Sequence, residues 1–178
     1  MEFTIKKAVP EDAEEILNVQ KVIGSETDNL TFGEEGLPTT VEEEREYLKY
    51  QQDSDSSALF VARVGNQIVG TCSYNGYPRE RMAHRGSLAI SLLKSEWGKG
   101  YGSKMMEEVI RFAKEEAKAE IISLEVRSDN ERAIHLYEKY GFQNIGTFPG
   151  FFKMEGKWID FELMNLYITE TKEKESRN

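Results

Sequence analysis

A glycine-rich loop constrains the fold of this chain more than any other stretch. Residues 97–103 carry glycine at every second position, directly after the apolar run Leu88 to Leu93. Glycine reaches positive φ and has no Cβ, so several backbone N–H groups can converge on one phosphate. The segment Ser103 to Ala117 has helical periodicity and would direct its unpaired N–H groups at the same point. The pattern predicts a strand, a glycine turn and a helix that hold a pyrophosphate, although a tight turn that binds nothing has the same pattern.

Length and charge limit the classes of protein to consider. With 178 residues, 39% of them hydrophobic, the chain can bury one core, so we expect a single domain over residues 1–168 and a polar, disordered tail over residues 169–178. The net charge of −9 argues against binding to nucleic acid or to an anionic membrane, and it suits a cationic substrate.

Several further features are expected to be absent. No apolar run is long enough to span a membrane, and the N-terminus lacks the layout of a signal peptide, so we expect a cytoplasmic protein. Cys72 is the single cysteine, and His84 and His135 are far apart in the sequence. These spacings predict no metal site, and Cys72 reads as a small buried residue rather than a covalent acyl carrier.

Hydrophobic periodicity and turn residues predict the element order β-α-α-β-β-β-α-β-α-β-β. Because a helix separates the strands 86–93 and 121–126, these two should be parallel. The predicted strands are 3–9, 58–64, 67–74, 86–93, 121–126, 142–152 and 157–168; the predicted helices are 10–24, 41–51, 103–117 and a short one opened by a capping box at Ser128 to Glu131 and ended by Gly141.

Two motifs then carry a resemblance to a known family. The glycine loop is followed by the strand sequence LEVR and by Asn130, Leu136-Tyr137 and Gly141-Phe142. Together they resemble the GNAT superfamily of acetyl-CoA-dependent N-acetyltransferases over residues 3 to 168, closest to the ribosomal-protein alanine and small-amine branches. The family's loop pattern begins with Gln or Arg, and this chain has Trp97 there.

The resemblance implies a mixed α/β fold. Its central sheet is mostly antiparallel, has helices on both faces, and contains a parallel strand pair that splays apart beside a bulge. Acetyl-CoA would lie in that gap as co-substrate, with pantetheine against Leu92 and Leu93. The residues implied to bind it are Leu92, Leu93, Trp97, Gly98, Lys99, Gly100, Tyr101, Gly102, Ser103, Asn130 and Tyr137.

The resemblance also implies catalytic roles. Tyr137 would protonate the departing thiolate of the coenzyme, and Asn130 reads as a helix cap, a coenzyme contact or both. Glu125 would take the proton of the amine, directly or through water, although an edge carboxylate paired with Lys or Arg is an equal alternative.

The acceptor is expected to be a primary amine of a small molecule, such as an amino acid or polyamine, or a peptide N-terminus. Carboxylates and aromatic rings suit a cationic amine, and the corresponding positions are Glu26, Asp28, Phe32 and Phe151. The same acidic loop could equally be a solvated surface. The alternative function is a non-catalytic module that binds or senses acetyl-CoA, and the chain could associate as a homodimer.

Overall fold

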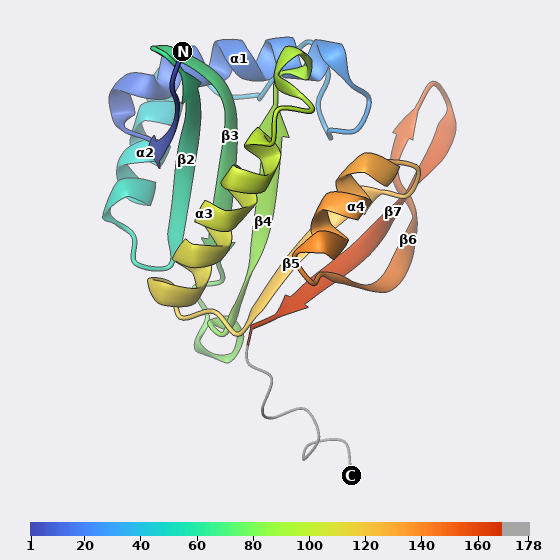
Figure 1. Cartoon of the computed structure of the whole chain (residues 1–178). Coiled ribbons are helices and arrows are strands. Elements are labelled where there is room, and N and C mark those ends of the chain that lie inside the picture. The colour runs from blue at the N-terminus through green and yellow to red at the C-terminus, as the bar shows by residue number, and fades with distance from the viewer. Residues whose placement is uncertain (169–178) are drawn as a thin grey trace.

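The computed structural model of the chain describes residues 1–168 and has a seven-stranded sheet with strand order β1-β2-β3-β4-β5-β7-β6 (Figure 1). The predicted order of helices and strands is confirmed, and the predicted tail lies outside the described residues. The strands are β1 (Phe3–Lys7), β2 (Ser57–Val64), β3 (Gln67–Gly76), β4 (Arg85–Leu92), β5 (Ile121–Arg127), β6 (Gln143–Met154) and β7 (Lys157–Tyr167); the helices are α1 (Ala13–Glu26), α2 (Val41–Asp53), α3 (Tyr101–Glu115) and α4 (Glu131–Lys139).

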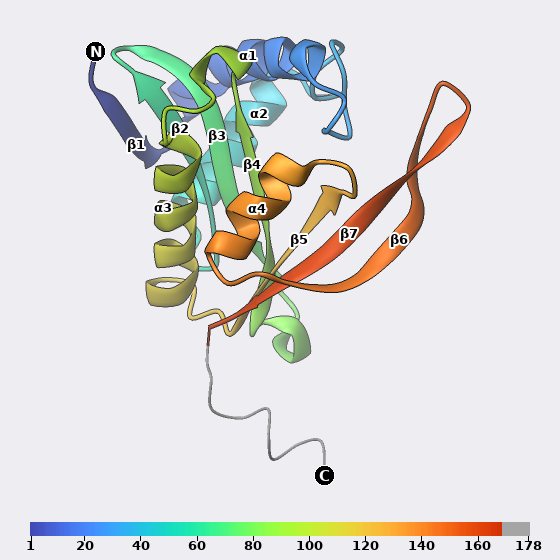
Figure 2. The same ribbon diagram turned by 45° about the vertical axis from the view of Figure 1, so that its right-hand side comes forward.

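The strands β4 and β5 form the parallel pair and separate soon after they meet. Their register covers only Arg85 with Ile121, Gly86 with Ile122 and Ser87 with Ser123. All other neighbouring strands are antiparallel. Both ribbon views show β5, β7 and β6 diverging from the rest of the sheet above this point (Figures 1 and 2). The splayed, mostly antiparallel sheet is therefore confirmed.

The bulge expected in the strand before the glycine loop is not present. Every residue of β4 from Gly86 to Leu92 has its own partner on β3, from Gly76 to Gly70, without a shift in register. Because β4 stays paired with β3 along this whole length, the gap arises where β5 leaves β4 rather than from an extra residue in β4.

Helices cover both faces of the sheet, as the resemblance implied. Side chains alternate between the two faces, so neighbouring strand residues enter different cores. Phe60, Tyr74 and Leu88 pack against α3 and α4 in one core. Val61 and Ile68 pack against α1 and α2 in the other.

Among the predicted helix ends that differ from the observed ones, three have a clear structural cause. Helix α3 begins at Tyr101, because Gly100 is its N-cap with φ of 79°. Helix α4 begins at Glu131 with Asn130 as N-cap, so the capping box predicted at Ser128 is wrong. Helix α1 runs to Glu26, past Gly24, which lies against Gly33 and permits a close approach there rather than ending the helix.

Candidate functional site

The gap between β4 and β5 opens into a cavity of about 770 Å³. Its walls come from the end of α1 and the loop after it, from β4, from the glycine loop and the first turn of α3, from β5 and α4, and from the β6–β7 hairpin. The carboxyl ends of parallel strands are where open α/β sheets generally bind ligands.

The glycine loop forms a cradle at one end of this cavity. Gly98 and Gly100 have φ of 77° and 79°, and a Cβ built at either would meet no atom within 4 Å. The N–H groups of the first turn of α3 have no acceptor within the helix, and among residues 1–168 no side chain caps them. Gly98, Gly100, Tyr101, Gly102 and Ser103 all line the cavity. This arrangement suits an anion such as a phosphate group.

Neighbouring elements hold the cradle in place. The ring of Tyr101 stacks on Phe3 of β1 with centroids 3.9 Å apart. The Tyr140 hydroxyl donates to the backbone oxygen of Ser103 at 3.1 Å, which joins α4 to the first turn of α3. Lys99, one of the predicted coenzyme contacts, is not a lining residue; its Nζ pairs with Glu96 at 3.0 Å.

Trp97 links the loop to both sides of the gap. Its indole Nε1 donates to the backbone oxygen of Leu92 at 2.9 Å, and the guanidinium of Arg132 lies 4.1 Å from the centre of the ring. Trp97 and Arg132 both line the cavity. Trp97 thereby places a cation from α4 beside the cradle. Sequence reasoning missed Arg132, and its position two residues after Asn130 was the available signal.

The backbone of β4 faces the gap at alternate residues. The N–H of Leu93 donates to Val69 of β3, so the backbone groups of Ile90 and Leu92 point the other way, into the gap. The oxygen of Leu92 already accepts the bond from Trp97, so the N–H is the backbone group of Leu92 that remains available in the gap. The expectation that both Leu92 and Leu93 present free groups is therefore corrected: the N–H of Leu93 is engaged, and Ile90 is the residue that was missed.

Tyr137 and Asn130 are placed by α4. Tyr137 is 8% exposed and lines the cavity, and burial raises the pKa of its hydroxyl to about 12. The hydroxyl is therefore protonated at neutral pH. Asn130 Oδ1 accepts the N–H of Ala133 at 3.3 Å, and Asn130 also lines the cavity. Its role as a helix cap is confirmed, and a coenzyme contact stays a prediction.

Glu125 lies on the face of β5 opposite Leu124 and Val126, and it lines the cavity. None of the ion pairs within residues 1–168 includes its carboxylate. The alternative of an edge carboxylate paired with Lys or Arg is thus not observed in the described part of the chain. Its position in the cavity wall is compatible with the proposed role as base.

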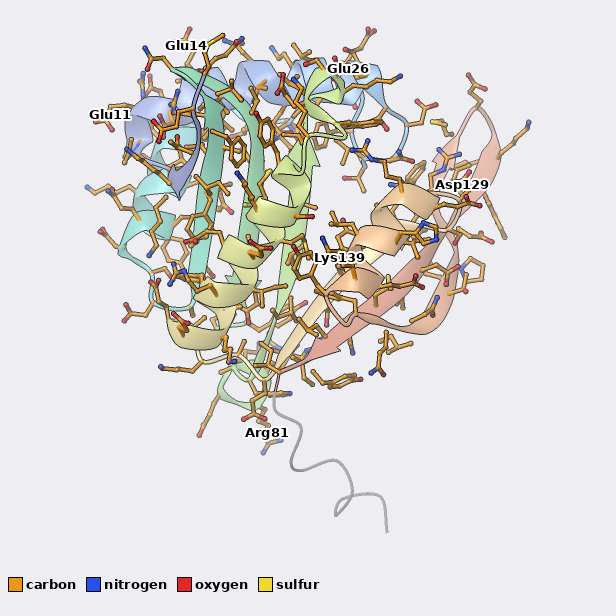
Figure 3. The ribbon with its side chains drawn as sticks, viewed as in Figure 1. Glu11, Glu14, Glu26, Arg81, Asp129 and Lys139 are labelled. Carbon is orange, nitrogen blue, oxygen red and sulfur yellow. The ribbon has the colours of Figure 1, made fainter. Side chains whose placement is uncertain are left out.

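The structure separates the four predicted acceptor residues into two pairs. Phe32 and Phe151 line the cavity. Glu26 lies at the outer end of α1, where its carboxylate accepts the backbone N–H of Lys94 at 2.8 Å (Figure 3). The backbone oxygen of Asp28 accepts a bond from Arg127 at 3.1 Å. Glu26 and Asp28 border a neighbouring polar hollow and are not among the residues that line the cavity.

The described residues add three observations on other kinds of site. Within residues 1–168, no group of three or more His, Cys, Asp or Glu residues is placed to hold a metal ion. Cys72 is buried, and burial raises the pKa of its thiol. No helix in the described part of the chain is long and apolar enough to cross a membrane.

Comparison with known proteins identifies the family. The sequence profile of the acetyltransferase (GNAT) family matches residues 26–142, which include the cradle, β5 and α4. The chain belongs to the GNAT family.

Solved GNAT structures share the fold over nearly the whole chain. An acetyltransferase of the GNAT family from Streptococcus pneumoniae is 33% identical, has a TM-score of 0.90, and is matched over 94% of this chain and 100% of its own. YncA from Salmonella typhimurium, a putative acetyltransferase solved with its cofactor acetyl-CoA, is 18% identical with a TM-score of 0.82 over 96% of both chains. At 18% identity, the similarity to YncA shows only that the two proteins share a fold.

Curated relatives include GNAT enzymes named for different acceptors. The L-amino acid N-acetyltransferase AaaT of Escherichia coli is 31% identical over 56% of this chain and 62% of its own. The N-alpha-acetyltransferase RimI of Mycobacterium tuberculosis is 28% identical over 53% of this chain and 58% of its own. The matches span about three fifths of the length of these relatives, so they do not assign an acceptor to this GNAT chain.

Proposed function

We propose that this chain is an acetyl-CoA-dependent N-acetyltransferase that moves an acetyl group to a primary amine by direct transfer. One observation carries the proposal: a single cavity joins the N-terminus of α3 to the buried hydroxyl of Tyr137 and to the carboxylate of Glu125, which has no ion-pair partner within residues 1–168. A phosphate seat, a proton donor and a proton acceptor thus border one space.

The residues present fit the coenzyme. Bound acetyl-CoA supplies an acetyl thioester, and the backbone N–H groups between Gly98 and Ser103 would hold its pyrophosphate. Arg132 would add a positively charged hydrogen-bond donor next to Trp97, the position where the family's pattern has the polar donors Gln or Arg. The N–H groups of Ile90 and Leu92 face the gap and would bind the pantetheine amides or the thioester oxygen.

The proton balance of the transfer assigns a role to each side chain. The acceptor ammonium first loses one proton to solvent, the neutral amine nitrogen then forms a bond to the thioester carbonyl carbon, the carbon–sulfur bond breaks, and the sulfur leaves as a thiolate. Glu125 would accept the proton that the amine nitrogen loses, directly or through water. Tyr137 would donate its proton to the thiolate, because burial keeps that hydroxyl protonated. A covalent acetyl-cysteine is not required, since Cys72 is 2% exposed and does not line the cavity.

Release of free thiol from acetyl-CoA tests this proposal. The purified protein is mixed with acetyl-CoA and each of a panel of primary amines, and the acetylated amine is identified by mass. We expect thiol release that depends on the amine and yields one acetyl group on nitrogen per thiol. Tight acetyl-CoA binding without turnover on any amine would instead support a non-catalytic sensor. The double variant Glu125→Gln with Tyr137→Phe is the control for background hydrolysis.

A further inference from the structure

The two ends of the cavity differ in chemistry. The coenzyme end comprises the cradle and α4, and the basic lining residues within the described chain, Arg132, His135 and Lys139, all belong to that helix. Lys139 lies at the α3-facing end of α4, where its Nζ donates to Ser103 Oγ at 3.3 Å (Figure 3). We name the other part, around Glu125, the acceptor end; its apolar wall consists of Ile23, Leu30, Phe32, Phe151 and Phe161.

Glu125 and this wall share one face of the sheet. Glu125 of β5 pairs with Leu163 of β7, and Arg127 pairs with Phe161, so all four side chains lie on the same side. Phe161 is therefore a diagonal neighbour of Glu125, at roughly 7–8 Å between backbones. If the nitrogen of a bound amine contacts the Glu125 carboxylate, the rest of the amine would pack against Phe161.

A bulge in β6 completes the wall with Phe151. The register passes from Phe148 opposite Phe161 to Phe152 opposite Ile159, so three residues of β6 face the single residue Asp160. The carboxylate of Asp160 accepts the N–H of Gly150 at 2.9 Å, and Gly150 has φ of 67°. This geometry stacks the ring of Phe151 on Phe161, with centroids 4.4 Å apart and an interplanar angle of 23°.

The charges at the acceptor end favour an ammonium group and disfavour a carboxylate. Glu125 has no ion-pair partner within residues 1–168, so its charge is available to a cationic amine. The basic lining residues lie at the coenzyme end. A substrate carboxylate placed next to the amine would meet the like charge of Glu125 and no cation.

Arg127 is the cation on the same face that could have bound such a carboxylate, but it is already occupied. Its Nε and Nη2 donate to the two carboxylate oxygens of Asp129 at 2.6 and 3.0 Å. Its Nη1 donates to the backbone oxygen of Asp28 at 3.1 Å. Arg127 borders the polar hollow and not the cavity, and its side chain is 16% exposed. Asp129 thus holds the guanidinium away from the acceptor end.

We infer that the acceptor is a primary monoamine on an aromatic or apolar body with no carboxylate beside the amine. Asp129 is the residue that excludes amino acids, because it neutralises Arg127. This inference rests on the proposed function. It also sets this chain apart from relatives whose names specify L-amino acids. A polyamine is disfavoured as well. Among residues 1–168, Glu125 and Glu96 are the carboxylates that line the cavity, and Glu96 is paired with Lys99, so a second ammonium group would lie against aromatic rings.

Four amines of related size test the inference by steady-state kinetics. We expect kcat/KM for 2-phenylethylamine to exceed that for phenylalanine and for spermidine on the order of 100-fold, because their extra charges have no partner. Phenylalaninamide should recover most of the loss, since it keeps the bulk of phenylalanine without its charge. A kcat/KM for phenylalanine or spermidine within about 3-fold of that for 2-phenylethylamine would overturn this inference but not the proposed function. A kcat/KM for phenylalaninamide as low as that for phenylalanine would do the same. If neither these four amines nor any other amine gives thiol release, the proposed function would be overturned too.

Two variants with matched controls test the named residues. Asp129→Ala should raise the ratio of kcat/KM for phenylalanine to that for 2-phenylethylamine about 10-fold, because Nε and Nη2 of Arg127 lose their carboxylate partner. Phe151→Ala should raise KM for 2-phenylethylamine about 10-fold and leave KM for acetyl-CoA unchanged. Asp55→Ala and Tyr50→Ala, on exposed residues that do not line the cavity, should change neither quantity. An unchanged ratio for Asp129→Ala would overturn its role in selection.

Discussion

Replacement of Arg132 by alanine should weaken acetyl-CoA binding about 10- to 100-fold. The guanidinium lies 4.1 Å from the Trp97 ring centre, beside a cradle that otherwise offers backbone N–H groups. A hydrogen bond to a charged group contributes about 1.5–3 kcal/mol, and the stacking on Trp97 adds about 0.5–1 kcal/mol by fixing the side chain. Because Arg132 is exposed, we expect a total loss of about 1.4–2.8 kcal/mol, and each 1.4 kcal/mol raises Kd about tenfold.

Calorimetric titration with acetyl-CoA measures this effect directly. Arg132→Lys should recover only part of the affinity, since Lys keeps the charge and loses the flat stacking surface. Trp97→Ala combined with Arg132→Ala should cost less than the sum of the single changes, because each removes the same contact. Arg45→Ala, on an exposed arginine of α2 that pairs with Glu42, is the control. An unchanged Kd for Arg132→Ala, or strictly additive losses in the double variant, would refute the role assigned to the Trp97–Arg132 pair.

Three further predictions concern the catalytic groups and the buried tyrosines. Tyr137→Phe should lower kcat about 100-fold with little change in acetyl-CoA Kd, and because the pKa of Tyr137 is about 12, the shape of the pH–rate profile below about pH 9 should stay the same. Glu125→Gln should lower kcat/KM about 10- to 100-fold and alter that profile; an unaltered profile would place the base elsewhere. Burial raises the pKa values of Tyr74 and Tyr137 to about 12, from about 10 in the unfolded chain. The free energy of unfolding therefore keeps its full value below about pH 10 and falls as the pH rises towards 12, because the unfolded chain loses these protons first. The urea midpoint should therefore fall between about pH 10 and pH 12, and the fall should be smaller in Tyr137→Phe.

Local sequence patterns predicted the architecture because the determinants of each element are local. The glycines at 98 and 100, the amphipathic segment after them and the turn residues between β2 and β3 act over a few residues, and all have the expected outcome. The predicted ends failed where two signals competed. Asn130 rather than Ser128 is the N-cap of α4, and α1 continues through Gly24, which was predicted to end it.

The parts of the site that could not be predicted depend on contacts between distant segments. Arg132 stacks on Trp97 from 35 positions away, and the pairing of β4 with β3 decides which backbone groups of β4 face the gap. Glu26 and Asp28 were predicted to contact the acceptor because of their charge. In the folded protein the carboxylate of Glu26 accepts the backbone N–H of Lys94, and the backbone oxygen of Asp28 accepts a bond from Arg127. The bulge that positions Phe151 had a signal in Pro149-Gly150, which are unusual inside a strand.

The most direct test of the central claim compares acetyl-CoA binding by two glycine variants. Gly100 and Gly156 both have φ of 79°, and an added Cβ meets no atom within 4 Å at either position. Gly100→Val and Gly156→Val should therefore lose similar stability, on the order of 1–2 kcal/mol. Gly156 lies at the turn of the β6–β7 hairpin, outside the cavity. The account predicts that Gly100→Val raises the acetyl-CoA Kd at least about 100-fold and that Gly156→Val binds as the unchanged protein does. Equal affinity in the two folded variants would contradict it.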